Sequence, residues 1–116
     1  MISLGSNVKI YLCTGHTDMR KGVNSLSLLA GSLLPGAVSS GAVFVFRGKS
    51  ADKIKILMWD GQGFCLFYKC FDRGKFIWLK SDDAGHISIT RAQLSMLLEG
   101  VDWRNPKWSE PPEYLG

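Results

Sequence analysis

Short runs of apolar, strand-forming residues recur along the chain between turns, and hydrophobic and polar residues alternate within some of them, a pattern typical of β-strands. The clearest example is the segment 53–59, in which two lysines fall on one face and Ile54, Ile56 and Met58 on the other. Asp60-Gly61 follows it and is the dipeptide typical of a tight hairpin turn. Strands are predicted at 8–13, 42–47, 53–59, 64–71, 75–79 and 86–89.

Two segments have the spacing of helices. From Met19 to Leu33 apolar residues recur every three or four positions, and Thr17 or Asp18 is placed to cap the N-terminus. Later, Thr90 has a glutamine three residues on, which is the spacing of a capping box before an apolar helix face. We therefore predict one helix beginning near residue 19 and a short second helix after residue 90.

These elements predict an α+β fold: a mostly antiparallel sheet with an N-terminal strand–helix unit and a short C-terminal helix. We expect the helices to cover one face of the sheet and to leave the other face free for cations. Residues 1–102 are predicted to form a single domain. Residues 103–116 contain three prolines and are predicted to form a tail.

The charge of the chain is concentrated in its middle. The 116 residues carry a formal net charge of +4, whereas the segment 47–80 alone holds eight cationic and three acidic side chains, a net +5. Arg-Gly-Lys occurs twice, at 47–49 and at 73–75. Glycine between two cations lets the backbone approach a phosphate while both side chains reach outward. The alternative is a solvated sheet face whose lysines serve solubility and protect strand edges.

A nucleic-acid interface is the more specific interpretation of this charge, because DNA phosphates are bound mainly by lysine and arginine. The candidate DNA-binding residues are Arg20, Lys21, Arg47, Lys49, Lys53, Lys55, Arg73 and Lys75. A second interpretation is a protein–protein adaptor, because tryptophan and tyrosine are enriched among interface hot spots. The candidate partner-binding residues are Trp103, Trp108 and Tyr114.

The sequence offers little for catalysis. His16 and His86 have no metal-ligand spacing, no phosphate-binding glycine motif occurs, and most of the aspartates fall in predicted turns. We therefore predict no catalytic centre, no metal and no cofactor, and an enzyme is the least favoured class.

The compartment follows from the cysteines and the hydropathy. Cys13, Cys65 and Cys70 form no Cys-x-x-Cys pair and lie in or beside apolar runs, as buried thiols do in a reducing environment. No signal peptide and no membrane span are predicted, and we expect a cytoplasmic protein without a membrane partner.

Several long motifs, in order, resemble one family of bacterial proteins. They are Thr-Asp-Met-Arg-Lys-Gly at 17–22, Val-Phe-Val-Phe-Arg-Gly-Lys at 43–49, Asp-Lys-Ile-Lys-Ile-Leu-Met-Trp-Asp-Gly at 52–61, Arg-Gly-Lys-Phe-Ile-Trp at 73–78 and Leu-Leu-Glu-Gly-Val-Asp-Trp-Arg at 97–104. The chain from about residue 8 to residue 107 resembles the TnpB-type accessory protein of insertion sequences of the IS-sixty-six family, which is distinct from the RNA-guided nuclease of the same label. The resemblance implies a non-catalytic accessory factor for DNA transposition that works beside a separate transposase.

Overall fold

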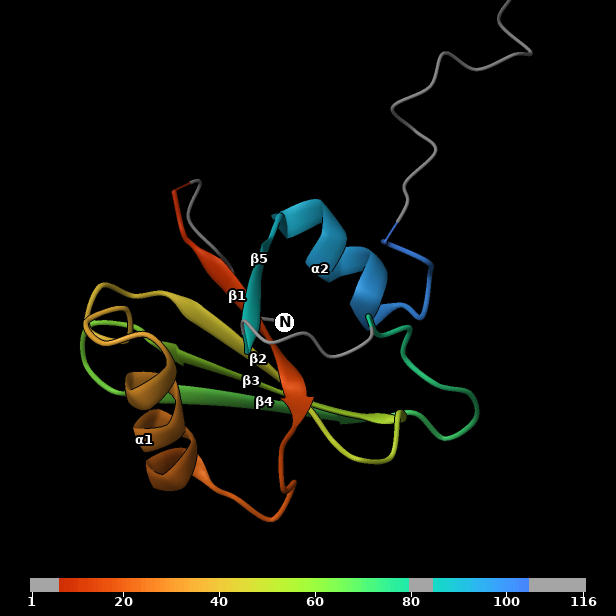
Figure 1. Cartoon of the computed structure of the whole chain (residues 1–116), viewed down its shortest axis with the longest axis horizontal. Helices are drawn as coiled ribbons and strands as arrows, with labels where there is room; N and C mark the ends of the chain where they lie inside the picture. The colour runs from red at the N-terminus through yellow and green to blue at the C-terminus, as the bar shows by residue number, and fades with distance from the viewer. Residues whose placement is uncertain (1–6, 80–84, 105–116) are drawn as a thin grey trace, which may run out of the picture.

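The computed structural model describes residues 7–79 and 85–104 (Figure 1). Five strands of this part pair in the order β4-β3-β2-β1-β5, where β1 and β2 are parallel and every other neighbouring pair is antiparallel. This confirms the predicted α+β fold. The elements are β1 (Ile10–His16), α1 (Val23–Leu33), β2 (Val43–Arg47), β3 (Lys53–Trp59), β4 (Phe64–Cys70), β5 (His86–Ile89) and α2 (Arg91–Leu98).

The parallel pair explains the position of α1. Two parallel neighbours cannot be joined by a tight turn, and α1 forms the crossover between β1 and β2. The pairings also fix which ends of the strands meet: Cys13 pairs with Phe46, Phe46 with Lys55, and Lys53 with Cys70. Thus β1, β2 and β4 all finish at the same end of the sheet, which is the end where β3 begins.

Both faces of the sheet are covered, one by each helix, which corrects the expectation of a free face. Val45 and Ile56 point to the side that Leu97 of α2 covers, and Phe44 and Leu57 point to the side of α1. Figure 1 shows the two helices on opposite sides of the sheet. The middle strands are buried on both faces, so the alternation of residue type along β3 does not leave a solvated side.

α1 begins four residues later than predicted. The Asp18 carboxylate accepts a hydrogen bond from the backbone N–H of Arg20, and the Lys21 N–H donates to the Asp18 carbonyl. Asp18 therefore stabilises a turn over residues 18–21 and does not cap the helix. The helix instead begins after Gly22, whose backbone is extended and which provides no side-chain cap. The loop 17–22 that results is a separate feature of the surface.

α2 has the predicted N-terminus. The Thr90 hydroxyl accepts from the Gln93 N–H at 3.0 Å, and the Gln93 side chain accepts from the Thr90 N–H at 2.8 Å, which completes the capping box. Gly100 has φ +77° just past the helix, and the Val101 N–H donates back to the Met96 carbonyl. Local sequence signals therefore determine both ends of this helix.

The segment 75–79 is not a strand, so that prediction was wrong. The Phe76 N–H donates to the Ala51 carbonyl at 2.9 Å, and the Trp78 indole donates to the same oxygen at 3.1 Å. The segment thus crosses the turn between β2 and β3 and has no strand pairing there. Its aromatic residues have the composition of a strand, but they serve packing instead.

Trp103 belongs to the body of the protein. Its side chain is 1% exposed, it packs with the core cluster beneath α2, and its indole N–H donates to the Ile77 carbonyl at 2.7 Å. The packed body therefore extends one residue beyond the boundary predicted at residue 102. Residues 105–116 lie outside the described part.

Candidate nucleic-acid interface

The topology gathers cations from three distant segments at one end of the sheet. These segments are the loop after β1, the turn between β2 and β3, and the turn after β4. These three segments carry seven cationic and three acidic side chains, a net +4 that equals the net charge of the whole chain. We call this surface the basic end; its cations are Arg20, Lys21, Arg47, Lys49, Lys53, Arg73 and Lys75.

Backbone hydrogen bonds hold the three segments together. The Thr17 N–H donates to the Arg47 carbonyl at 2.8 Å and joins the first loop to the end of β2. On the other side, the Phe71 N–H donates to the Asp52 carbonyl at 2.9 Å, beside the bond between Phe76 and Ala51. The relative positions of the cations therefore follow from the backbone and not from long side chains alone.

Glycine is needed at the centre of the first Arg-Gly-Lys. A Cβ on Gly48 would lie 2.8 Å from Cγ of Met19 and 3.3 Å from the Ser50 carbonyl oxygen. Met19 thus packs directly on the turn between β2 and β3. In the second Arg-Gly-Lys, Gly74 has φ +100°, a conformation that other residues rarely adopt.

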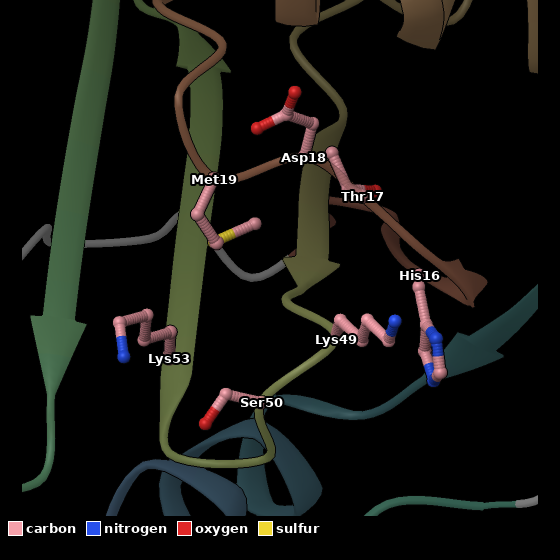
Figure 2. Close-up of a pocket in the computed structure, with 7 residues that line it drawn as sticks. All are labelled: His16, Thr17, Asp18, Met19, Lys49, Ser50 and Lys53. Atoms are coloured by element: carbon pink, nitrogen blue, oxygen red, sulfur yellow. The ribbon is translucent and has the colours of Figure 1, made fainter.

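An open pocket of about 460 Å³ lies between the loop after β1 and the turn after β2 (Figure 2). Figure 2 shows Met19 between Thr17 and Lys53, while the Lys49 side chain extends towards His16. The pocket therefore combines a thioether with cationic and hydroxyl groups. Its lining residues are His16, Thr17, Asp18, Met19, Lys49, Ser50 and Lys53.

Sequence reasoning had selected Lys49 and Lys53 of this pocket but missed the rest of its lining. His16 ends β1, Thr17 follows it, and Ser50 lies in the turn between β2 and β3, so no sequence motif identifies these three residues. The available signal was positional: loops that follow neighbouring parallel strands meet at one edge of a sheet and commonly form binding sites there.

Four cations of the basic end are exposed and make no ion pair with another described residue: Lys21, Lys49, Arg73 and Lys75. Arg20 is paired with Asp18 at 2.8 Å, and this guanidinium holds the pKa of the Asp18 carboxyl well below its usual range. Because the Arg20 side chain is 92% exposed, it remains accessible to a phosphate. Lys53 is paired with Asp52 at 3.2 Å.

Two of the predicted DNA-binding cations have surroundings different from those expected. Lys55 is 6% exposed; its ammonium group donates to the Lys21 carbonyl at 2.7 Å and lies 4.7 Å from the centre of the Tyr68 ring. Arg47 is half-buried with its guanidinium over the Trp78 ring, and this burial lowers the pKa of Arg47. Lys55 is therefore a structural cation, because the α1 side of β3 is packed and not solvated.

The predicted partner-binding residues are not brought together on a described surface. Trp103 is buried in the core, which leaves its ring inaccessible to a second protein. Trp108 and Tyr114 lie outside the described residues.

The cysteines were expected to be buried, but of the three free thiols only Cys13 is buried, whereas Cys65 is half-buried and Cys70 is exposed. Burial raises the pKa of the Cys13 thiol to about 12. The pKa of Cys65 is raised by burial first and then by its hydrogen bond to Asp60.

Within residues 7–79 and 85–104, no set of three His, Cys, Asp or Glu side chains is arranged to hold a metal ion. In the same part of the chain no helix has the length and hydropathy to cross a membrane.

Comparison with known proteins agrees with the motifs. The model of the IS66 Orf2-like proteins matches residues 8–108, and the chain belongs to this family. It is an accessory protein associated with insertion-sequence transposition.

The chain is similar to two proteins of Sinorhizobium fredii (strain NBRC 101917 / NGR234). "Uncharacterized protein y4hO" is 47% identical, with all of both chains covered. "Uncharacterized protein y4jC" is 36% identical over 92% of this chain and 91% of its own. No solved structure matches the chain.

Proposed function

We propose that this protein is a non-catalytic accessory factor that binds DNA through the basic end and works beside a separate transposase. The observation that carries the proposal is the convergence of cations from three segments of the chain at one end of the sheet. The family supports the transposition context. In this proposal the transposase supplies the catalytic chemistry.

The basic end has the chemistry that phosphate backbones require. Exposed lysines and arginines neutralise phosphates and release counterions, so affinity falls steeply with salt. Lys49 and Arg73 extend from turns that are held by backbone hydrogen bonds to their neighbours. The interface is therefore formed by loops at one edge of the sheet, whereas the sequence had predicted a sheet face.

The experiment is fluorescence anisotropy with labelled duplex DNA from the ends of an insertion sequence, measured at several salt concentrations. We expect binding that weakens as salt rises, with a slope of log K against log salt near −0.9 for each phosphate contacted. Lys49→Ala and Arg73→Ala are each expected to weaken binding and to reduce that slope by about one contact.

Matched controls are available at the other end of the molecule. Lys9 and Arg91 are exposed cations that precede β1 and begin α2, so their alanine variants remove the same charge away from the basic end. These controls are expected to retain nearly full affinity. Equal losses from both pairs of variants, or no binding at low salt, would refute the proposal.

A further inference from the structure

The pocket beside Met19 has a feature that phosphate binding alone does not require. Met19 is half-buried on Gly48, and its side chain contributes an apolar wall where the stems of Lys49 and Lys53 also lie. Stacked duplex DNA presents phosphates and sugars to a surface of this kind, while its base faces stay inside the helix. An apolar wall within a cationic surface therefore matches a ligand with an exposed base.

The polar groups of the pocket are arranged around that wall. Lys49 and Ser50 are exposed on the turn, and His16 is exposed at the end of β1. Figure 2 shows the Asp18 carboxylate directed away from Lys49 and Ser50, and Arg20 binds this carboxylate. The Ser50 hydroxyl donates to the Asp52 carboxylate, which also pairs with Lys53. The cation that the turn offers to an anionic ligand is therefore Lys49, which makes no ion pair with another described residue.

We propose that this pocket receives an unpaired nucleotide of a DNA strand, with its base against Met19 and His16 and its phosphate on Lys49. Thioether sulfur makes favourable contacts with aromatic rings, and histidine is among the side chains on which unpaired bases stack. The volume of about 460 Å³ lies within the range of ordinary small-ligand pockets. This inference rests on the proposed function and names its substrate: DNA with unstacked bases.

The test compares one labelled oligonucleotide, single-stranded or annealed to its complement, at constant salt. We expect the single strand to bind more tightly than the duplex. Met19→Ala and His16→Ala are each expected to weaken single-strand binding about fivefold and to change duplex binding by less than about twofold. Leu28→Ala is the matched control, because Leu28 is a 76% exposed aliphatic residue on α1 outside the pocket.

The outcomes separate the two proposals. Equal affinity for both DNA forms, together with pocket variants that change nothing, would overturn the unpaired-nucleotide site and leave duplex binding intact. Absence of binding to either form would contradict the proposed function itself. Competition by deoxyadenosine monophosphate at an equal concentration of nucleotide units would assign the pocket to a free nucleotide and overturn recognition within a strand.

Folding of the variants is checked by thermal unfolding, because Met19 packs on Gly48. If Met19→Ala lowers the melting temperature, the His16→Ala result decides the question, since His16 is exposed. Loss of single-strand preference in the folded His16→Ala protein supports the site, and full retention of that preference refutes it.

Discussion

At the residue scale, Lys49 and Lys55 show how one side-chain type has two roles within neighbouring segments. Lys49 is exposed on a turn and makes no ion pair with another described residue. Lys55 is buried, donates to the Lys21 carbonyl and lies over the Tyr68 ring. Its hydrogen bond and its apolar stem link β3 to the loop that precedes α1.

Lys55→Ala is therefore expected to lower stability. The loss of a hydrogen bond from a charged donor, together with the packing of the stem, is expected to cost about 2 kcal/mol of unfolding free energy. Urea unfolding of Lys55→Ala measures this cost. Lys49→Ala is expected to behave in the opposite way: its unfolding free energy changes by less than about 0.5 kcal/mol, but its affinity for DNA falls. If Lys55→Ala is as stable as the unmodified protein but binds DNA more weakly, Lys55 belongs to the DNA interface and its structural role is contradicted.

At the scale of elements, the turn between β3 and β4 depends on one carboxylate. Asp60 Oδ1 accepts hydrogen bonds from the N–H groups of Gln62 and Gly63, both at 2.9 Å. These bonds, the Gln62 bond first, lower the pKa of the Asp60 carboxyl. The stabilisation is thus fully present above the unfolded pKa of about 3.9 and is lost as pH falls through the lower folded value.

This turn makes a pH-dependent prediction. Asp60→Ala is expected to have a lower melting temperature than the unmodified protein at pH 7, and the difference is expected to narrow as the pH falls below about 4. Thermal unfolding between pH 7 and pH 2 measures it. Asp60→Asn keeps an acceptor oxygen that does not titrate in this range, so it separates the hydrogen bond from the charge. A difference for Asp60→Ala that stays constant with pH would contradict this account.

Elements with local signals were predictable from the sequence, and elements that depend on distant partners were not. The capping box of α2 and the Asp60-Gly61 turn are formed by residues within a few positions of one another. The start of α1 was misplaced because the Asp18 carboxylate serves a turn instead of a helix. The segment 75–79 has strand composition, but only pairing with a distant strand edge could have made it a strand.

The candidate site was predictable in part, for the same reason. The two Arg-Gly-Lys turns and their charge are visible in the sequence, and the structure brings both to the basic end. The burial of Lys55 was not visible, because alternation along β3 identifies two faces without telling which distant helix covers each one. The Met19 pocket was missed because its parts belong to two loops that meet only in the folded sheet.

At the scale of the whole molecule, Trp103 determines where the packed body ends. Its ring fills the core beneath α2 and its indole holds the Ile77 carbonyl. Trp103→Ala is expected to lower the unfolding free energy by about 3–5 kcal/mol, through the cavity and the lost hydrogen bond. Denaturant unfolding measures this loss. Trp59→Ala, at a partly exposed position on β3, is expected to cost clearly less, and equal costs would contradict the assignment of Trp103 to the core.

The order of the strands also has a consequence for how the protein is made. β1 lies between β2 and β5, Ile10 pairs with Ile89, and the core around Ile10 also contains Trp103. During synthesis the first strand therefore emerges long before two of the segments that bury it. The core cannot close until residue 103 has left the ribosome, and folding in one late step is expected from such distant contacts.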